Sequence, residues 1–140
     1  MEFNYKIAGG DFNAAGNASS AVKKILKQLN VNPAIAKRAV VALYEGEVNI
    51  VAHAWSGNMK VLIDKEKILI RLADEGPGIP DIEKAMEAGF STASPQVREM
   101  GFGAGMGLPN IKKNVDVLDI SSEENKGTKV EMTIYLNNNG

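Results

Sequence analysis

The pattern of hydrophobic and polar positions predicts a chain in which helices come early and strands come mostly late. Residues Phe3 to Ile7 read as a strand, and helical patterns follow from about Ala14 to Leu29 and from Ala34 to Trp55. Asn32 before Pro33 is typical of a helix start, because Asn caps free backbone N–H groups and proline suits the first helical position. We therefore expect two consecutive helices after the first strand.

The second half of the chain shows shorter apolar runs separated by turn residues. The elements expected there are strands at Lys60–Ile63 and Lys67–Ala73 around the turn Asp64–Glu66, helices at Ile82–Ala88 and from about Leu108, and a hairpin of Val117–Ser121 with Lys129–Leu136. This order predicts an α+β fold, a sandwich with helices on one face of a mixed, largely antiparallel sheet. With 140 residues the chain is expected to form a single domain, 1–140, and residues 137–140 to be a disordered tail.

Composition and charge narrow the class of partner. The net charge is −1 and the isoelectric point is near 5.9, and no basic run occurs, so nucleic acid is not expected as a partner. The chain contains no cysteine, which excludes disulfides and thiolate metal sites. The first residues lack a signal-peptide pattern, and no apolar run is long enough to span a bilayer. We therefore expect a cytoplasmic protein that does not bind membranes.

A carboxylate follows the most apolar strand of the chain and precedes a glycine-proline-glycine turn. The run Ile68–Ala73 is followed by Asp74, Gly76 and Gly78, with Ile79 next. A side chain at a strand end is accessible, and glycines let backbone approach a flat ligand without an intervening Cβ. The motif therefore suits a nucleotide pocket, although turns rich in Asp, Gly and Pro also join ordinary elements.

The long helix carries a carboxylate and an amide on one face. At about 100° per residue, Glu45 and Asn49 lie within roughly 40° of each other, whereas Glu47 points to nearly the opposite side. Such a pair can hold a hydroxyl and a hard cation, as Mg²⁺-assisted phosphoryl transfer requires, or it can be a solvated polar face. Gly46 in mid-helix predicts that another element packs closely there.

Glycine recurs at every second position before the last predicted helix. Gly103, Gly105 and Gly107 precede Leu108 and a helical run. Backbone amides of such a loop, together with the helix N-terminus, can bind phosphate oxygens; a flexible surface linker is the alternative. The spacing matches neither the dinucleotide-binding G-x-G-x-x-G nor the P-loop.

These three motifs, in this order, resemble the Bergerat-fold (GHKL) ATPases, the superfamily of gyrase and the histidine kinases. Within it the chain is similar to the small stand-alone branch of anti-sigma factors and switch-protein serine kinases, from about Asn32 to Leu136. The resemblance implies a two-layer ATP-binding sandwich in which Asn49 binds Mg²⁺ and nucleotide, Glu45 is the general base, and Asp74 hydrogen-bonds the adenine amino group.

The resemblance also assigns nucleotide contacts to the glycines and their neighbours. The residues implied are Gly76, Gly78, Ile79, Gly103, Gly105, Gly107, Leu108 and Thr128. Thr128 stands where a hydroxyl reaches adenine, and Gly103 to Gly107 belong to a lid over the phosphates. Ala88–Thr92 looks like the lid entry of the switch-protein kinases, whereas Ser94–Met100 is an insertion relative to their shorter lids.

The implied activity is that of an ATP- and Mg²⁺-dependent protein serine/threonine kinase of the anti-sigma or switch-protein type, with a STAS-domain antagonist as substrate and a possible homodimer. One alternative is a nucleotide-dependent protein that sequesters a sigma factor or other regulator with little catalysis. Another is an ATPase module of a larger complex. His53, one turn after Asn49, either lines the same pocket or serves in packing.

Overall fold

The computed structural model describes residues 1–78, 86 and 107–136. Five strands form one sheet in the order β1-β2-β3-β5-β4, and every pairing between these described strands is antiparallel. The strands are β1 (Glu2–Ala8), β2 (Ser56–Ile63), β3 (Lys67–Glu75), β4 (Val117–Glu123) and β5 (Gly127–Tyr135). The expected α+β fold is confirmed, but the sheet is antiparallel rather than mixed.

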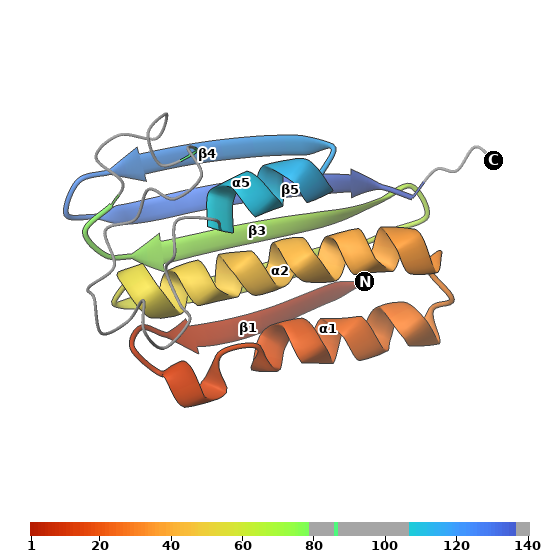
Figure 1. The fold of residues 1–140 in the computed structure, drawn as a ribbon, viewed down its shortest axis with the longest axis horizontal. Coiled ribbons are helices and arrows are strands. Elements are labelled where there is room, and N and C mark those ends of the chain that lie inside the picture. The colour runs from red at the N-terminus through yellow and green to blue at the C-terminus, as the bar shows by residue number, and fades with distance from the viewer. Residues whose placement is uncertain (79–85, 87–106, 137–140) are drawn as a thin grey trace.

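The helices α1 (Asn17–Gln28), α2 (Pro33–His53) and α5 (Gly107–Asn114) lie side by side on one face of this sheet (Figure 1). Two elements are predicted between β3 and α5. The helix at Ile82–Ala88, apart from Met86, and most of the glycine-rich run lie outside the described residues, as does the tail 137–140. No helix in the described ranges combines the length and apolar character needed to cross a membrane.

The long helix α2 begins as its sequence predicts. The Asn32 side chain accepts hydrogen bonds from the backbone N–H groups of Ala34 and Ile35, at 2.9 and 3.4 Å, and Pro33 occupies the first turn. The first helix differs from its prediction, because a 3-10 turn (Phe12–Ala14) precedes α1. Gly16, with a φ of 95°, separates the two. A left-handed residue of this kind breaks the helical path, so α1 starts only at Asn17.

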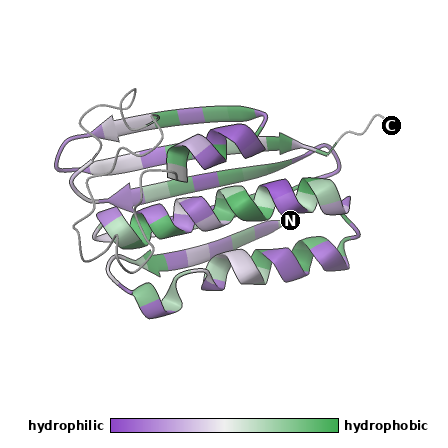
Figure 2. Ribbon diagram, in the orientation of Figure 1, coloured by the Kyte–Doolittle hydropathy of each residue, from purple (hydrophilic) through white to green (hydrophobic). Residues whose placement is uncertain are grey.

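The core lies between the helices and the covered face of the sheet. Its fully buried large side chains come from α1, α2, α5 and the three central strands: Leu26, Leu43, Met59, Ile68, Ile70, Ile111, Met132 and Ile134. Along α1 hydrophobic and hydrophilic residues alternate in Figure 2, as a helix with one buried side requires. The sheet's other face carries the alternate residues of each strand, which are partly or fully exposed for the most part.

Every strand extends beyond its predicted limits at one end or both, and β2 and β3 show why. β2 begins at Ser56 rather than Lys60, because Ser56 pairs with Ala8 on one side and Glu75 on the other. β3 continues through Asp74 to Glu75 for the same reason. Polar and glycine residues in these segments do not look like strand residues, and pairing with neighbours overrides their weak local preference.

Candidate functional site

Asp74 lies near the end of β3 and is held by the neighbouring strand. Its Oδ1 accepts a hydrogen bond of 3.0 Å from the backbone N–H of Thr128, at the start of β5. The carboxyl group is half-buried, and burial raises its pKa above the ordinary value although the hydrogen bond from Thr128 lowers it in part. Among the described residues, no hydrogen bond reaches the second oxygen, Oδ2. With respect to the described residues, Asp74 therefore has one oxygen fixed and one available.

The hydroxyl of Thr128 lies beside Ser122 on β4. The two side-chain oxygens are 2.9 Å apart, and the Ser122 hydroxyl also donates to the Gly127 carbonyl at 3.1 Å. Thr128 is 8% exposed. The structure thus brings Asp74 and Thr128 together, as the motif resemblance predicts, and adds Ser122, which no sequence motif marked.

Gly76 and Gly78 are required by the packing of the protein itself. A Cβ at Gly76 would lie 2.9 Å from Cα of Ala54, at the end of α2, and one at Gly78 would lie 2.6 Å from the carbonyl oxygen of Glu123. Gly78 also has a φ of 82°. The turn after β3 therefore packs closely between the end of α2 and the end of β4. This packing fixes the position of the turn beside Asp74.

Glu45 is hydrogen-bonded to α5, the helix that follows the glycine-rich run. Its Oε2 accepts a hydrogen bond of 2.9 Å from the side-chain amide of Asn110 on α5. Asn110 is in turn linked to Asn114, whose amide donates to the Asn110 carbonyl at 2.8 Å. Glu45 and Asn110 are both half-buried. The carboxylate is thereby oriented by a contact between two helices, and sequence inspection did not identify Asn110.

Asn49 stands one helical turn after Glu45 and is also half-buried. Gly46, between them, lies against β3: an added Cβ would collide with a terminal methyl of Leu72. The predicted close approach at this glycine is confirmed. The segment of α2 that carries Glu45 and Asn49 therefore packs directly on β3, the strand that carries Asp74 near its end.

Glu47 faces away from this pair, but it is not a free surface residue. It is 2% exposed, and its carboxylate accepts hydrogen bonds at 2.6–3.2 Å from the N-terminus of α1: the backbone N–H groups of Gly16, Ala18 and Ser19, and the Ser19 hydroxyl. A carboxylate at a helix N-terminus satisfies free N–H groups and complements the helix dipole. Glu47 therefore points away from Glu45 and Asn49, as its spacing predicts, and it holds the N-terminus of α1 against α2.

Of the predicted site residues not yet discussed, some lie in the described part of the chain and others do not. Gly107 begins α5, and Leu108 is buried in the core. Ile79, Gly103 and Gly105 lie outside the described residues. His53 ends α2 and is half-buried.

The site thus combines a half-buried carboxylate at a strand end with a fixed carboxylate and an amide on the adjoining helix. A model of the histidine kinase-like ATPase domain matches residues 11–134. The chain belongs to this family. Its members share the ATPase domain that the family is named for, and the matched range contains every element described above except β1 and the last residues.

Individual relatives place the chain more finely. It is 32% identical over 118 residues to the serine/threonine-protein kinase RsbT of Bacillus subtilis (strain 168), covering 81% of this chain and 83% of that protein. It is 36% identical over 103 residues to the anti-sigma F factor of Caldanaerobacter subterraneus subsp. tengcongensis, covering 70% and 68%. The solved structure of the mycobacterial sensor histidine kinase MprB matches with a TM-score of 0.55 at 15% identity, covering 96% and 97%, which shows a shared fold.

Proposed function

We propose that this chain is an ATP-dependent protein serine/threonine kinase of the anti-sigma or switch-protein type. The observation that carries the proposal is the half-buried Glu45 carboxylate, fixed by Asn110 on the helix that follows the glycine-rich run. A general base must be held at one position to accept a proton from a reacting hydroxyl. The similarity to a serine/threonine-protein kinase over most of both chains supports the same activity.

The residues around Asp74 fit adenine. Oδ1 is occupied by the Thr128 N–H, which leaves Oδ2 to accept a hydrogen bond from the adenine amino group. The turn at Gly76 and Gly78 would form the wall of the base pocket with Ile79, and the Thr128 hydroxyl would reach the base directly or through water. A carboxylate acceptor favours adenine over guanine, because guanine presents a carbonyl oxygen, another acceptor, at this position.

The phosphate end of the nucleotide is assigned to α2 and to the start of α5. Asn49 offers one amide oxygen, which suits a cation held mainly by phosphates, and we assign it to Mg²⁺. Bound Mg²⁺·ATP supplies the transferable phosphoryl group and charge neutralisation. Gly103, Gly105, Gly107 and Leu108 would contribute lid contacts, including N–H groups at the N-terminus of α5.

The chemistry that the chain's own residues perform is then proton transfer and positioning. Glu45 would accept the proton of a serine or threonine hydroxyl while that oxygen forms its bond to the γ-phosphorus and the bond from phosphorus to the ADP leaving group breaks. Asn110 holds Glu45 in place, and Asn49 is kept one turn away by the helix itself. The close seating of α2 on β3 at Gly46 keeps these groups at a fixed distance from the base pocket.

For the protein substrate we propose a STAS-domain antagonist, with the chain acting as a single domain, 1–140, and as a possible homodimer. A second function, nucleotide-dependent binding of a sigma factor with little catalysis, is supported by the similarity to an anti-sigma F factor.

One experiment separates the two functions. Purified protein is incubated with γ-labelled ATP, Mg²⁺ and candidate STAS-domain proteins from the same genome, beside the Glu45→Gln variant. Label transfer to a serine or threonine that depends on Glu45 supports the kinase. Stoichiometric sigma-factor capture that needs ATP, unchanged in the Glu45→Gln variant and without label transfer, supports the binding function.

A further inference from the structure

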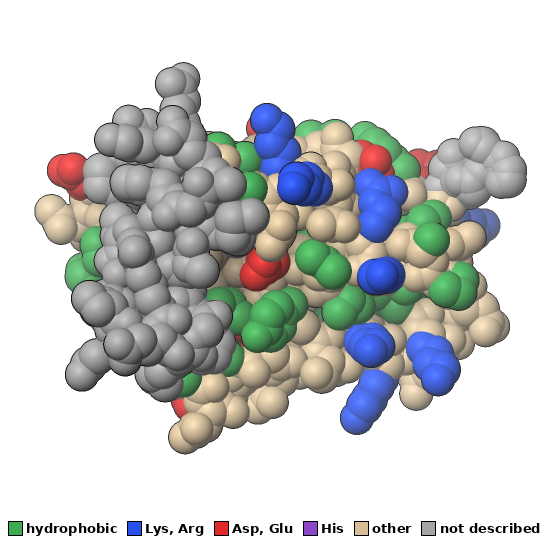
Figure 3. All heavy atoms as spheres, in the orientation of Figure 1, with side chains coloured by type: hydrophobic (Ala, Val, Ile, Leu, Met, Phe, Trp, Pro, Cys, Tyr) green, Lys and Arg blue, Asp and Glu red, His purple; other side chains and the backbone are tan. Residues whose placement is uncertain are grey.

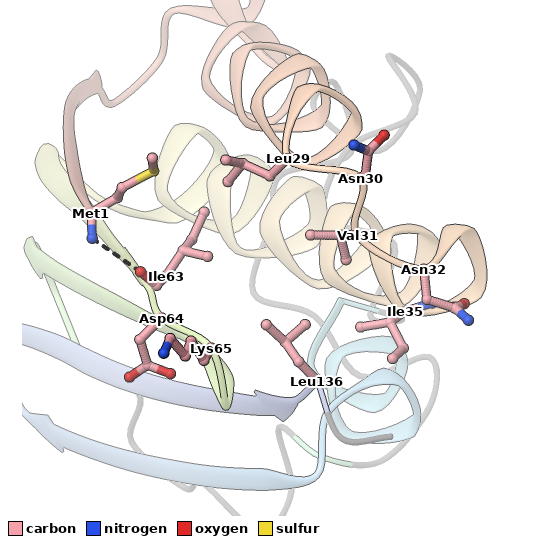
Figure 4. A pocket seen from close by; sticks show the side chains of 10 residues that line it. All are labelled: Met1, Leu29, Asn30, Val31, Asn32, Ile35, Ile63, Asp64, Lys65 and Leu136. Atoms are coloured by element: carbon pink, nitrogen blue, oxygen red, sulfur yellow. Dashed lines mark hydrogen bonds between the residues drawn. The ribbon is translucent and has the colours of Figure 1, made fainter. Parts of the chain in front are cut away.

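A groove lies at the other end of the molecule from Asp74 and Glu45. It has a volume of about 430 Å³ and lies between the loop joining α1 to α2, the turn joining β2 to β3, and the residue after β5 (Figure 4). Because Lys65 precedes β3 and Asp74 lies near its end, the strand separates groove from candidate site by roughly 25 Å. The groove is therefore independent of the nucleotide pocket proposed above.

The groove is lined mainly by large apolar side chains, which converge in Figure 4 from separate elements: Met1, Leu29, Val31, Ile35, Ile63 and Leu136. Met1 is 70% exposed and Leu29 is 37% exposed. The chain's own residues 137–140 are Asn-Asn-Asn-Gly, so they offer no apolar side chain to fill it. An open apolar groove of this kind is typical of a site where a partner inserts a side chain.

The helical layer beside the groove is strongly basic although the whole chain has a net charge of −1. Helices α1, α2 and α5 contain six lysines and Arg38, against two glutamates. Both glutamates are engaged, Glu45 by Asn110 and Glu47 by the N-terminus of α1. Figure 3 shows the cationic side chains gathered over the part of the helical face that lies toward the groove.

The lysines of this face are available to an external anion. All six are exposed, and within the described part of the chain none of them forms a salt bridge, whereas Arg38 pairs with Asp116. Lys27 lies in the last turn of α1 and Lys37 near the start of α2, the two helix ends that the groove's loop joins. Lys65 lines the groove itself, next to Asp64. Apolar lining and positive charge therefore adjoin each other.

We propose that the groove and its lysines dock an acidic segment of a partner protein that carries one or two large apolar side chains. The apolar side chains enter the groove, and the flanking carboxylates meet Lys27, Lys37 and Lys65, which gives complementary charge. A membrane is less suited, because the apolar residues line a concavity instead of projecting as an amphipathic helix would. The partner binds here without nucleotide, so this interaction goes beyond the proposed kinase activity.

The test begins with selection of a random 12-residue peptide display library on the immobilised protein without nucleotide. Recovered sequences are expected to combine Asp or Glu with Leu, Ile, Met or Phe. A synthetic copy should shift the backbone amide NMR signals of residues 29–35 and 63–65. Its dissociation constant should rise about tenfold or more in Lys27→Glu/Lys37→Glu and in Leu29→Ser.

The matched control reverses the charge at two lysine positions on the open face of the sheet. Lys6→Glu/Lys129→Glu changes net charge by the same amount at exposed positions and should alter the dissociation constant by less than about twofold. Melting curves confirm that all variants fold.

Three results would overturn the proposal. They are recovered peptides without acidic residues, signal shifts that map outside the groove, or an equal loss of binding in the control. Binding of phosphatidylserine vesicles that is lost in Lys27→Glu/Lys37→Glu, with no peptide recovered, would identify a membrane surface instead. Since no nucleotide is present, each of these results leaves the kinase proposal to be judged by label transfer alone.

Discussion

Asn110 donates a hydrogen bond of 2.9 Å from its side-chain amide to Oε2 of Glu45, and so joins α5 to the proposed general base on α2. α5 begins at Gly107, the last glycine of the run proposed as the lid. The Asn110 side chain therefore connects the helix that follows the proposed lid to the proposed base. The orientation of the Glu45 carboxylate is thus expected to depend on the position of α5.

We expect Asn110→Ala to lower kcat by roughly tenfold to a hundredfold with little change in KM for ATP, because the base is misplaced while the nucleotide contacts remain. Steady-state label transfer measures both constants. Asn58→Ala is the matched control, since Asn58 is an exposed asparagine on the open face of the sheet. An Asn110→Ala variant with normal kcat would show that the hydrogen bond plays no part in positioning Glu45.

Glu45 and Asn49 should have separable roles. Glu45→Gln should leave Mg²⁺·ATP binding largely intact and reduce turnover by roughly 10²- to 10⁴-fold, whereas Asn49→Ala should abolish Mg²⁺-dependent binding. Titration calorimetry and label transfer distinguish the two. Glu66→Gln, an exposed glutamate in the turn between β2 and β3, supplies a neutral control. Full turnover by Glu45→Gln would exclude Glu45 as the base.

Asp74→Asn should weaken ATP binding by at least about tenfold, the effect of losing a charged hydrogen bond of roughly 1.5–3 kcal/mol in a buried site. The wild-type protein should prefer ATP to GTP. Calorimetry with both nucleotides checks each expectation, and equal affinity for GTP would contradict the assignment of Asp74 to adenine.

The same substitution should stabilise the empty protein. Burial raises the pKa of Asp74, so the folded state holds this proton more tightly than the unfolded chain, and ionised Asp74 costs stability as pH rises from the ordinary carboxyl value of 3.8 through the folded value. At pH 7 without nucleotide, Asp74→Asn should therefore melt at a higher temperature than wild type. A lower melting temperature would mean that the Thr128 hydrogen bond outweighs the desolvation of the charge.

Glu47→Ala should destabilise the fold by about 3 kcal/mol or more, because three backbone N–H groups and the Ser19 hydroxyl lose their acceptor in a buried position. Glu47→Gln keeps one acceptor oxygen and should be milder. Ser19→Ala removes a single hydrogen bond and should cost about 1 kcal/mol. Urea unfolding measures all three, and a wild-type midpoint for Glu47→Ala would contradict the capping role.

Gly78 and Gly10 form a matched pair for the turn after β3. Both have positive φ, 82° and 80°, but an added Cβ meets the Glu123 carbonyl at Gly78 and nothing within 4 Å at Gly10. Alanine at Gly10 should cost about 1 kcal/mol from backbone strain alone. Alanine at Gly78 should cost more and also reduce ATP affinity, because the turn beside Asp74 must shift. Equal costs by urea unfolding would show that the turn can yield without strain.

Local signals were sufficient for the elements that depend on neighbours in sequence. Asn32 and Pro33 set the start of α2, since the capping hydrogen bonds reach only two and three residues ahead. The helical period placed Glu45 and Asn49 on one face and Glu47 on the other. The glycine at position 46 indicated a close contact, which Leu72 makes.

The partners of those residues depend on contacts between segments far apart in the chain. Helical periodicity is enough to predict that Glu47 faces away from Glu45. Its burial against α1, about thirty residues earlier, follows only from the packing of the two helices. Likewise, Glu45 was found by its spacing, whereas Asn110, 65 residues away, becomes its neighbour only when α5 packs on α2. Periodicity predicts the face of a helix or strand on which a side chain lies. Whether that side chain is buried or hydrogen-bonded depends on which other elements pack against that face.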